Sequence, residues 1–157
     1  MIRDALPAEA DYLAELWFSG WQDAHANILP LKLAQLRTLA SFREHMREHL
    51  PDIRVAESDS DPLGFVMFKG DELYQFYVGA AARGTGVAAE LMQDAEAVMK
   101  ARGVDTAWLA CAIGNDRAAR FYAKRGWQHV GNTVLDLPMP DGSVFRLEVW
   151  RFEKRLA

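Results

Sequence analysis

The stretch Leu73-Tyr-Gln-Phe-Tyr-Val-Gly-Ala-Ala-Ala-Arg-Gly-Thr-Gly-Val-Ala-Ala-Glu-Leu-Met92 decides how the rest of this sequence is interpreted. Its first residues are apolar and aromatic, which favours a β-strand. It then passes through Gly79 and three alanines to the turn Arg83-Gly84-Thr85-Gly86. Beyond the glycines, apolar residues recur at the spacing of an amphipathic helix. These residues are Val87, Ala88, Leu91, Met92, Ala95, Val98 and Met99. The pattern predicts a strand, a glycine-rich turn and a helix that runs to about Arg102.

The glycine-rich turn is suited to hold a phosphate. The first amides of a helix have no partner within the helix, and the helix dipole places positive potential there. Gly84 and Gly86 carry no Cβ that would keep a ligand away from the backbone, and Arg83 can pair with a phosphate oxygen. We therefore predict an anion site at this turn that needs neither a metal nor a lysine.

Length and composition limit the classes of protein to consider. We expect a single domain over 1–157, which is long enough to bury a substantial core. The formal charge of −4 and the lack of a basic run argue against a nucleic-acid partner. The single cysteine, Cys111, rules out an internal disulfide and favours a reducing compartment. No long apolar run follows Met1, so we expect no signal peptide, no membrane span and a cytoplasmic location.

The remaining pattern predicts an α/β or α+β sheet with helices on its faces. Helices are expected over 7–19, where Gly20 would end the helix, over 31–50 with a capping box at Ser41–Glu44, and over 115–125. The expected strands are 2–5, 53–57, 63–69, 73–78, 106–112, 128–137 and 144–152.

The residues Gly84-x-Gly86-x-x-Ala89 also fit the dinucleotide-binding fingerprint. That fingerprint opens a βαβ unit whose second strand ends in an acidic residue that binds the ribose. Here the acidic residue at about the right distance, Asp105, precedes the next strand, and the end of that strand, 110–114, holds none. A dinucleotide-binding enzyme is therefore disfavoured, and for the turn alone a plain strand–helix turn explains the glycines equally well.

A second motif, Asn115-Asp-Arg-Ala118-Ala-Arg-Phe121-Tyr122-Ala-Lys-Arg-Gly126-Trp127, follows the next strand. Together with Arg83-Gly-Thr-Gly-Val-Ala88, it resembles the GCN5-related N-acetyltransferase (GNAT) family. The family's first signature has Arg or Gln, then Gly at the fourth position and Gly or Ala at the sixth. Its second signature has Asn, Ala three residues on, an aromatic pair ending in Tyr, and Gly followed by an aromatic residue. The order of elements agrees over most of the chain.

This resemblance implies a GNAT-like mixed, mostly antiparallel central sheet of six to seven strands with about four helices on its faces. It also implies acetyl-coenzyme A as the acyl donor. The pyrophosphate would lie on the amides of the glycine-rich turn, and the pantetheine arm would pair with the backbone near Phe76–Val78 like an added strand. The cofactor-binding residues implied in this way are Phe76, Val78, Arg83, Gly84, Thr85, Gly86, Val87, Ala88, Ala89 and Asn115.

Catalytic roles follow from the same resemblance. The family's tyrosine at the position of Tyr122 donates a proton to the departing thiolate, and a phenol with a pKa of about 10 is protonated at neutral pH. Tyr122 also suits a core position beside Phe121, and Asn115 suits a helix N-cap as well as the cofactor contact. Glu72 matches the place of a catalytic Glu in some histone-type members, although a solvated carboxylate beside Asp71 in a turn is the favoured explanation. His25 is a second candidate base, and a water chain can replace either residue.

The acceptor side carries no motif. Trp17, Trp21 and His25 fall at four-residue steps and share a face if they are helical. We expect Trp17 in the core, and Trp21 and His25 at an acceptor pocket whose aromatic wall suits an aromatic amine or a cation. The partner is an amine-bearing small molecule or a peptide or protein amine, and a homodimer through 144–152 is left open.

We expect no metal site. His45 and His49 share a helix face, but Met46 stands where a zincin needs Glu, and no third ligand is evident. Cys111 is expected to be a buried strand residue and not a nucleophile. Two functions are therefore retained. One is an N-acetyltransferase that uses direct transfer, and the other is a non-catalytic acyl-CoA-binding sensor or regulatory module.

Overall fold

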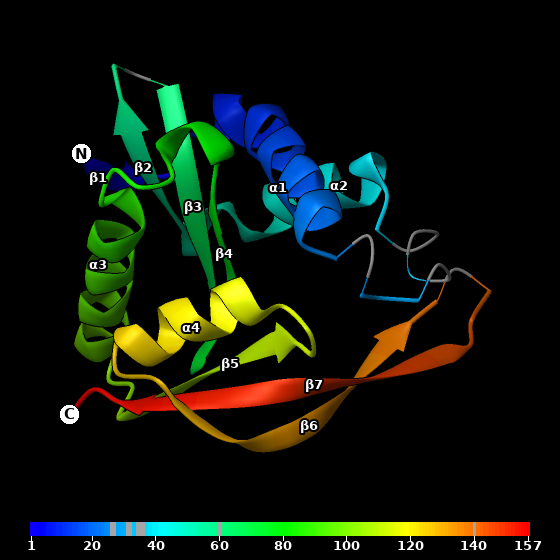
Figure 1. Ribbon diagram of the computed structural model, residues 1–157. Helices are drawn as coiled ribbons and strands as arrows, with labels where there is room; N and C mark the ends of the chain where they lie inside the picture. The colour runs from blue at the N-terminus through cyan, green and yellow to red at the C-terminus, as the bar shows by residue number, and fades with distance from the viewer. Residues whose placement is uncertain (26–27, 31–32, 34–36, 60, 140) are drawn as a thin grey trace.

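The computed structural model describes residues 1–157 except 26–27, 31–32, 34–36, 60 and 140 (Figure 1). One seven-stranded sheet lies at its centre, in the order β1-β2-β3-β4-β5-β7-β6. The strands are β1 (Ile2–Asp4), β2 (Ile53–Ser58), β3 (Asp61–Lys69), β4 (Glu72–Val78), β5 (Thr106–Ala112), β6 (Gln128–Pro138) and β7 (Val144–Arg155). The α-helices of the described residues are α1 (Ala10–His25), α2 (Leu39–His49), α3 (Val87–Ala101) and α4 (Asp116–Lys124). Every strand pair is antiparallel except β4–β5, so the expected mixed, mostly antiparallel sheet is confirmed.

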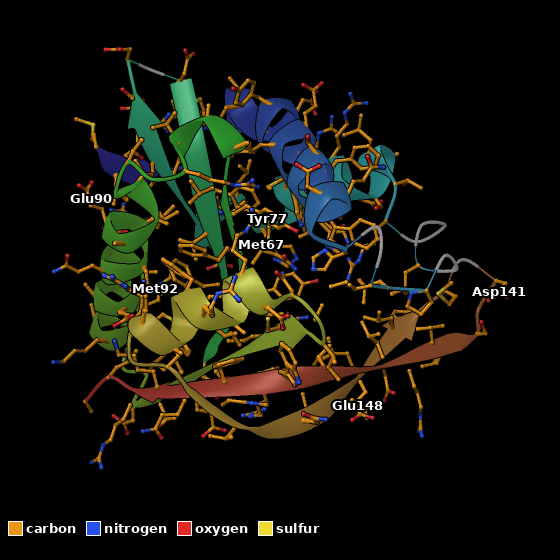
Figure 2. The ribbon with its side chains drawn as sticks, viewed as in Figure 1. Met67, Tyr77, Glu90, Met92, Asp141 and Glu148 are labelled. Carbon is orange, nitrogen blue, oxygen red and sulfur yellow. The ribbon has the colours of Figure 1, made fainter. Side chains whose placement is uncertain are left out.

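The sheet separates two layers of helices. Helices α1 and α2 pack on one face, whereas α3 and α4 pack on the other (Figure 1). Alternate side chains of β3 lie on opposite faces of the sheet. Phe65 and Met67 contact the α1–α2 layer, and Val66 and Phe68 contact the α3 layer. This alternation is the period of two that a strand covered on both faces requires. Figure 2 shows Met92 of α3 directed toward the sheet.

Strands β4 and β5 meet at one end and then diverge. The only ladder pair between them in the described residues joins Glu72 to Trp108, supported by the Trp108 amide, which donates to the carbonyl of Asp71 over 3.1 Å. A register shift in β4 also leaves Tyr74 without a pairing partner on β3. The β5-facing edge of β4 beyond Glu72 therefore has backbone amides and carbonyls that no strand uses, and it opens into a pocket.

Helix α1 corrects the prediction that Gly20 ends the first helix. A 3₁₀ turn at Pro7–Glu9 precedes α1, which passes through Gly20 and continues to His25. The aromatic ring of Tyr77 explains the glycine, because a Cβ at position 20 would lie 2.5 Å from Tyr77 Cδ1. Gly20 is therefore present for close packing and not as a helix stop.

Helix α2 begins later than predicted and has a different cap. It starts at Leu39, and Thr38 is its N-cap, because Thr38 Oγ1 accepts a hydrogen bond from the Ser41 amide (3.1 Å). The predicted capping box at Ser41–Glu44 is therefore wrong by one turn. The earlier part of the predicted 31–50 helix falls largely on 31–32 and 34–36, which lie outside the described residues.

The other boundaries agree with the prediction within a few residues. The expected helix at 115–125 is α4, whose N-cap Asn115 accepts a hydrogen bond from the Ala118 amide over 3.4 Å. The helix predicted to run to Arg102 is α3, and the strand predicted at 144–152 is β7, which extends to Arg155. Among the helices of the described residues, none combines the length and apolar character needed to cross a membrane.

Candidate active site

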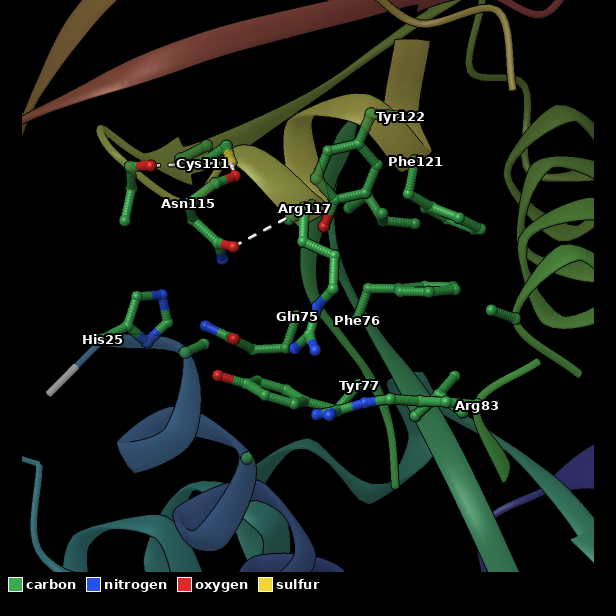
Figure 3. A pocket seen from close by; sticks show the side chains of 18 of the residues that line it. His25, Gln75, Phe76, Tyr77, Arg83, Cys111, Asn115, Arg117, Phe121 and Tyr122 are labelled. Atoms are coloured by element: carbon green, nitrogen blue, oxygen red, sulfur yellow. Dashed lines mark hydrogen bonds between the residues drawn. The ribbon is translucent and has the colours of Figure 1, made fainter. Parts of the chain in front are cut away.

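A pocket of about 340 Å³ fills the space where β4 and β5 diverge (Figure 3). Its walls come from β4 between Leu73 and Val78, from the end of β5 at 110–112, and from the glycine-rich turn before α3. The start of α4 and the end of α1 complete it. Segments that are far apart in the sequence therefore meet at one cavity, with the α3 turn at one end and α1 at the other.

The turn before α3 presents open backbone to the pocket. Gly84 and Gly86 have φ angles of 78° and 85°, in the left-handed region that favours glycine. A Cβ at either position would meet no protein atom within 4 Å, so the space above the turn is free. Gly86 is the N-cap of α3 and no side chain caps this helix, which leaves its first amides to be satisfied by solvent or a ligand.

The residues predicted at this turn do not all face the pocket. Arg83, Gly84, Gly86 and Ala88 line it, whereas Thr85, Val87 and Ala89 do not. Thr85 Oγ1 donates to the carbonyl of Ala82, which holds the turn together. The three residues outside the lining belong to the same turn and the start of α3. An anion can therefore contact their backbone amides although their side chains do not line the pocket.

Strand β4 and helix α4 supply the apolar wall. Phe76 and Val78, both predicted, line the pocket on β4. The ring of Phe76 stacks on that of Phe121, with centroids 5.5 Å apart. Asn115 lines the pocket as well and also caps α4, so the two roles considered for it are compatible.

Tyr122 is held by aromatic contacts with its hydroxyl toward the pocket (Figure 3). Its ring lies 5.8 Å from that of Phe121 and 5.8 Å from that of Phe152. Burial raises the pKa of the Tyr122 phenol above its usual value, and the neighbouring Cys111 thiol adds to the effect. The phenol is therefore protonated at neutral pH. It lies on the pocket wall and not in the sealed core.

Cys111 lines the pocket but is poorly suited to covalent chemistry. Burial raises the pKa of its thiol to about 12, with Asp116 as a smaller cause, so the thiolate is not formed at neutral pH. This fits the expectation of a buried strand residue and not of a nucleophile. Among the described residues, no group of three His, Cys, Asp or Glu side chains is arranged to hold a metal.

His25 lies at the α1 end of the pocket with one ring nitrogen occupied. Its Nδ1 is 3.0 Å from the carbonyl oxygen of Trp21, which can only accept, so Nδ1 carries the proton. Burial lowers the pKa of His25 to about 4, with Arg37 as a smaller cause. The imidazole is therefore neutral at pH 7, and Nε2 has a free lone pair.

The structure places Trp21 and Glu72 outside the pocket lining. Trp21 lies behind His25, with ring centroids 5.4 Å apart, so it supports the wall and does not form it. Glu72 sits where β4 and β5 join, and burial raises the pKa of its carboxyl to about 7, with Asp71 adding to the rise and Lys69 opposing it. Glu72 can therefore accept a proton near neutral pH, but it does not line the pocket.

Four lining residues carry functional groups that the sequence did not single out, namely Tyr74, Gln75, Tyr77 and Arg117. Figure 3 shows the side chains of Gln75, Tyr77 and Arg117 directed into the pocket. Two of them could have been found from the sequence. Arg117 belongs to the second motif, and Tyr77 lies within the range Phe76–Val78 that is expected to pair with the pantetheine arm. Gln75 belongs to the run Leu73–Val78, all of which lines the pocket along the open edge of β4, and no motif marks it in the sequence.

The family model described as the acetyltransferase (GNAT) family matches residues 10–127. The chain belongs to this family. It is 34% identical over 103 residues to uncharacterized N-acetyltransferases from Mycobacterium bovis and Mycobacterium tuberculosis. This match covers 62% of the chain and 66% of the length of those relatives.

Solved structures show the same fold. A GCN5-related N-acetyltransferase from Rhodopseudomonas palustris superposes with a TM-score of 0.76 at 22% identity, covering 99% of this chain and 94% of that one. The PaiA N-acetyltransferase from Thermoplasma acidophilum, in complex with coenzyme A, gives 0.71 at 21% identity over 99% and 98%. The yncA protein from Salmonella typhimurium, with its cofactor acetyl-CoA, gives 0.73 at 14% identity over 100% and 94%. The resemblance to GNAT proteins is thus confirmed for family and fold.

Proposed function

We propose that this chain is a single-domain N-acetyltransferase that transfers an acetyl group directly from acetyl-CoA to an amine. One observation carries the proposal. A single pocket joins an uncapped helix N-terminus, a strand edge with unused backbone groups and a tyrosine that stays protonated at neutral pH. These are the three features that a phosphate-ended, amide-containing thioester donor requires.

The proposed donor site uses mainly backbone. The pyrophosphate accepts hydrogen bonds from the first amides of α3, where the helix dipole favours negative charge, and Arg83 pairs with a phosphate oxygen. The pantetheine arm pairs with β4 near Phe76–Val78, where β5 has moved away. Two solved proteins of this fold carry coenzyme A or acetyl-CoA, which supports this choice of donor.

In the proposed reaction the amine nitrogen attacks the thioester carbonyl while both are held in one pocket. A backbone amide near Val78 stabilises the oxyanion. The new C–N bond forms, the C–S bond breaks, and Tyr122 protonates the departing thiolate. The amine loses its proton to Nε2 of neutral His25, to Glu72 or to a water chain between the amine and one of these groups.

A non-catalytic acyl-CoA sensor is the alternative, and nothing in the pocket favours it. The two functions differ in turnover. The test incubates the protein with acetyl-CoA and a panel of amines, and it measures free thiol together with the mass of the acetylated amine. Thiol release that depends on an amine, with no acetyl group left on the protein in the absence of amine, supports direct transfer. Binding of acetyl-CoA without release by any amine would support the sensor.

A further inference from the structure

The α1 end of the pocket has a charge character that differs from the protein as a whole. The chain has a formal charge of −4, yet the described residues that line the pocket include no Asp or Glu. They include Arg83 and Arg117, and neither forms an ion pair with a carboxylate of the described residues. The acidic residue next to Arg117 in the sequence, Asp116, is exposed and lies outside the lining, and its charge acts on Cys111 at the β5 wall, where it adds to the rise of the thiol pKa.

The chain between α1 and α2 adds further positive charge and no negative charge. From Ala24 to Phe42 the sequence contains Lys32 and Arg37 but no Asp or Glu. Arg37 lies close enough to depress the pKa of His25 and to lower that of Tyr77, against the larger rise that burial causes there. A positive potential therefore extends from Arg37 to the residues at the α1 end of the pocket.

The two pocket arginines have different positions relative to the proposed donor. Arg83 belongs to the turn that would hold the pyrophosphate, so its charge is used when the donor is bound. Arg117 projects from α4, and Figure 3 shows its guanidinium directed toward Gln75 and Tyr77. Its charge therefore remains available beside the α1 end, together with two neutral hydrogen-bonding side chains.

We infer that the acceptor is a small amine that also carries an anionic group, a carboxylate or a phosphate, which pairs with Arg117. This inference rests on the proposed function and names its substrate class. A polycation such as a polyamine would meet like charge in the pocket and no carboxylate to compensate its lost hydration. An anionic amine gains a charge-assisted hydrogen bond from Arg117, which orients its amino group toward the thioester.

Matched pairs of amines test the inference by thiol release with acetyl-CoA. L-amino acids are compared with their amides, glucosamine 6-phosphate with glucosamine, and spermidine and kanamycin serve as polycations. The anionic member of at least one pair should have a kcat/KM about tenfold or more above its partner. The amino acids and the amino-sugar phosphate separate the two sources of the anion. Preference for the amides, for glucosamine or for the polycations would overturn the inference.

The variant Arg117→Gln shows whether this side chain is responsible. It should raise KM for the anionic acceptor about tenfold and leave KM for acetyl-CoA within about twofold. The control Arg120→Gln removes a charge from the same helix outside the lining and should change neither constant. If Arg117→Gln raises only the KM for acetyl-CoA, Arg117 binds the donor and the inference is wrong.

A binding measurement covers the case in which no amine of the panel is turned over. The melting temperature of the protein saturated with coenzyme A is measured with each member of every pair. A further rise with an anionic amine, absent in Arg117→Gln, supports the inference. No rise with any anionic amine contradicts it. Failure of acetyl-CoA itself to raise the melting temperature contradicts the proposed function instead, so the two failures are distinguishable.

Discussion

The end of the pocket beside α3 presents backbone, whereas the end beside α1 presents side chains. At the α3 end, Gly84 and Gly86 expose the amides of an uncapped helix, and a Cβ there would meet nothing. At the α1 end, His25 and Tyr77 project into the cavity from a helix and a strand that pack tightly on each other at Gly20. A site made of backbone needs glycine at fixed spacing, so it leaves a pattern in the sequence. A site made of side chains depends on which elements meet, and it leaves none.

The largest effect is expected where the two ends meet, at Tyr122. The change Tyr122→Phe removes the proposed proton donor and keeps the ring contacts with Phe121 and Phe152. We expect kcat to fall by about 10²-fold or more, because a positioned general acid contributes that much. Binding of acetyl-CoA should stay within about twofold. Steady-state kinetics and a thermal-shift titration measure the two quantities, with Tyr12→Phe on the exposed side of α1 as the control. A kcat close to that of the wild type would exclude an acid role.

Alanine at Gly86 tests the backbone end. The left-handed φ of 85° makes Gly86→Ala cost about 1 kcal/mol of stability. Because its Cβ would enter the space proposed for the pyrophosphate, affinity for acetyl-CoA should also fall about tenfold or more. Gly70→Ala is the matched control, since Gly70 has a φ of 61° and equally open surroundings in the β3–β4 turn. Equal affinity for acetyl-CoA in both variants would remove the anion site from this turn.

Alanine at Gly20 tests the side-chain end. Its Cβ would meet the Tyr77 ring at 2.5 Å, so Gly20→Ala should lower the free energy of unfolding by about 1–3 kcal/mol despite the better helix propensity of alanine. In a Tyr77→Ala background the clash is gone, and the same change should stabilise the protein by about 0.5–1 kcal/mol. Urea unfolding of the wild type, the two single variants and the double variant measures the sign of the change in the free energy of unfolding. If Gly20→Ala is stabilising in both backgrounds, α1 does not pack on Tyr77 as described.

The last effect concerns the pH dependence of stability at His25. Burial lowers the pKa of His25 to about 4, below the ordinary 6.5. The folded state therefore binds fewer protons than the unfolded state between these pH values, and this contribution to stability is lost as the pH falls from 6.5 toward 4. His25→Gln should reduce that loss by about 2 kcal/mol. Urea unfolding at pH 7 and pH 4.5 measures it, with His129→Gln on β6 as the control. An unchanged pH slope in His25→Gln would show that the imidazole is hydrated.

The contrast between the two ends also explains what the sequence could predict. Strands β2 to β7 were placed within a few residues, because alternation and turn residues mark them locally. The cap at Asn115 and the glycine turn were predicted for the same reason. The predicted helix stop at Gly20 was wrong because the glycine leaves room for the ring of Tyr77, which is 57 positions away in the sequence. The cap at Thr38 was missed because Ser41 offers an equally good local pattern, and only the packing of α2 decides between them.

Site residues divide in the same way. Those of the two motifs were named from the sequence, and the structure brings most of them to one pocket. Gln75 escaped prediction because the whole run Leu73–Val78 lines the pocket, whereas the resemblance pointed only to Phe76–Val78. Trp21 and Glu72 were named, but Trp21 lies behind His25 and Glu72 lies at the joint of β4 and β5. Their positions depend on how the elements meet, which the spacing along one element does not determine.

A thermal-shift titration with acetyl-CoA, coenzyme A, NAD and NADP tests the central claim most directly, because a ligand that binds only the folded state must raise the melting temperature. At a concentration about 100 times the Kd, acetyl-CoA and coenzyme A should each raise it by roughly 5–10 °C. NAD and NADP should leave it unchanged. No rise with the coenzyme A ligands, or a rise with NAD, would contradict the assignment of the Gly84–Gly86 turn as the site of an acyl-CoA pyrophosphate.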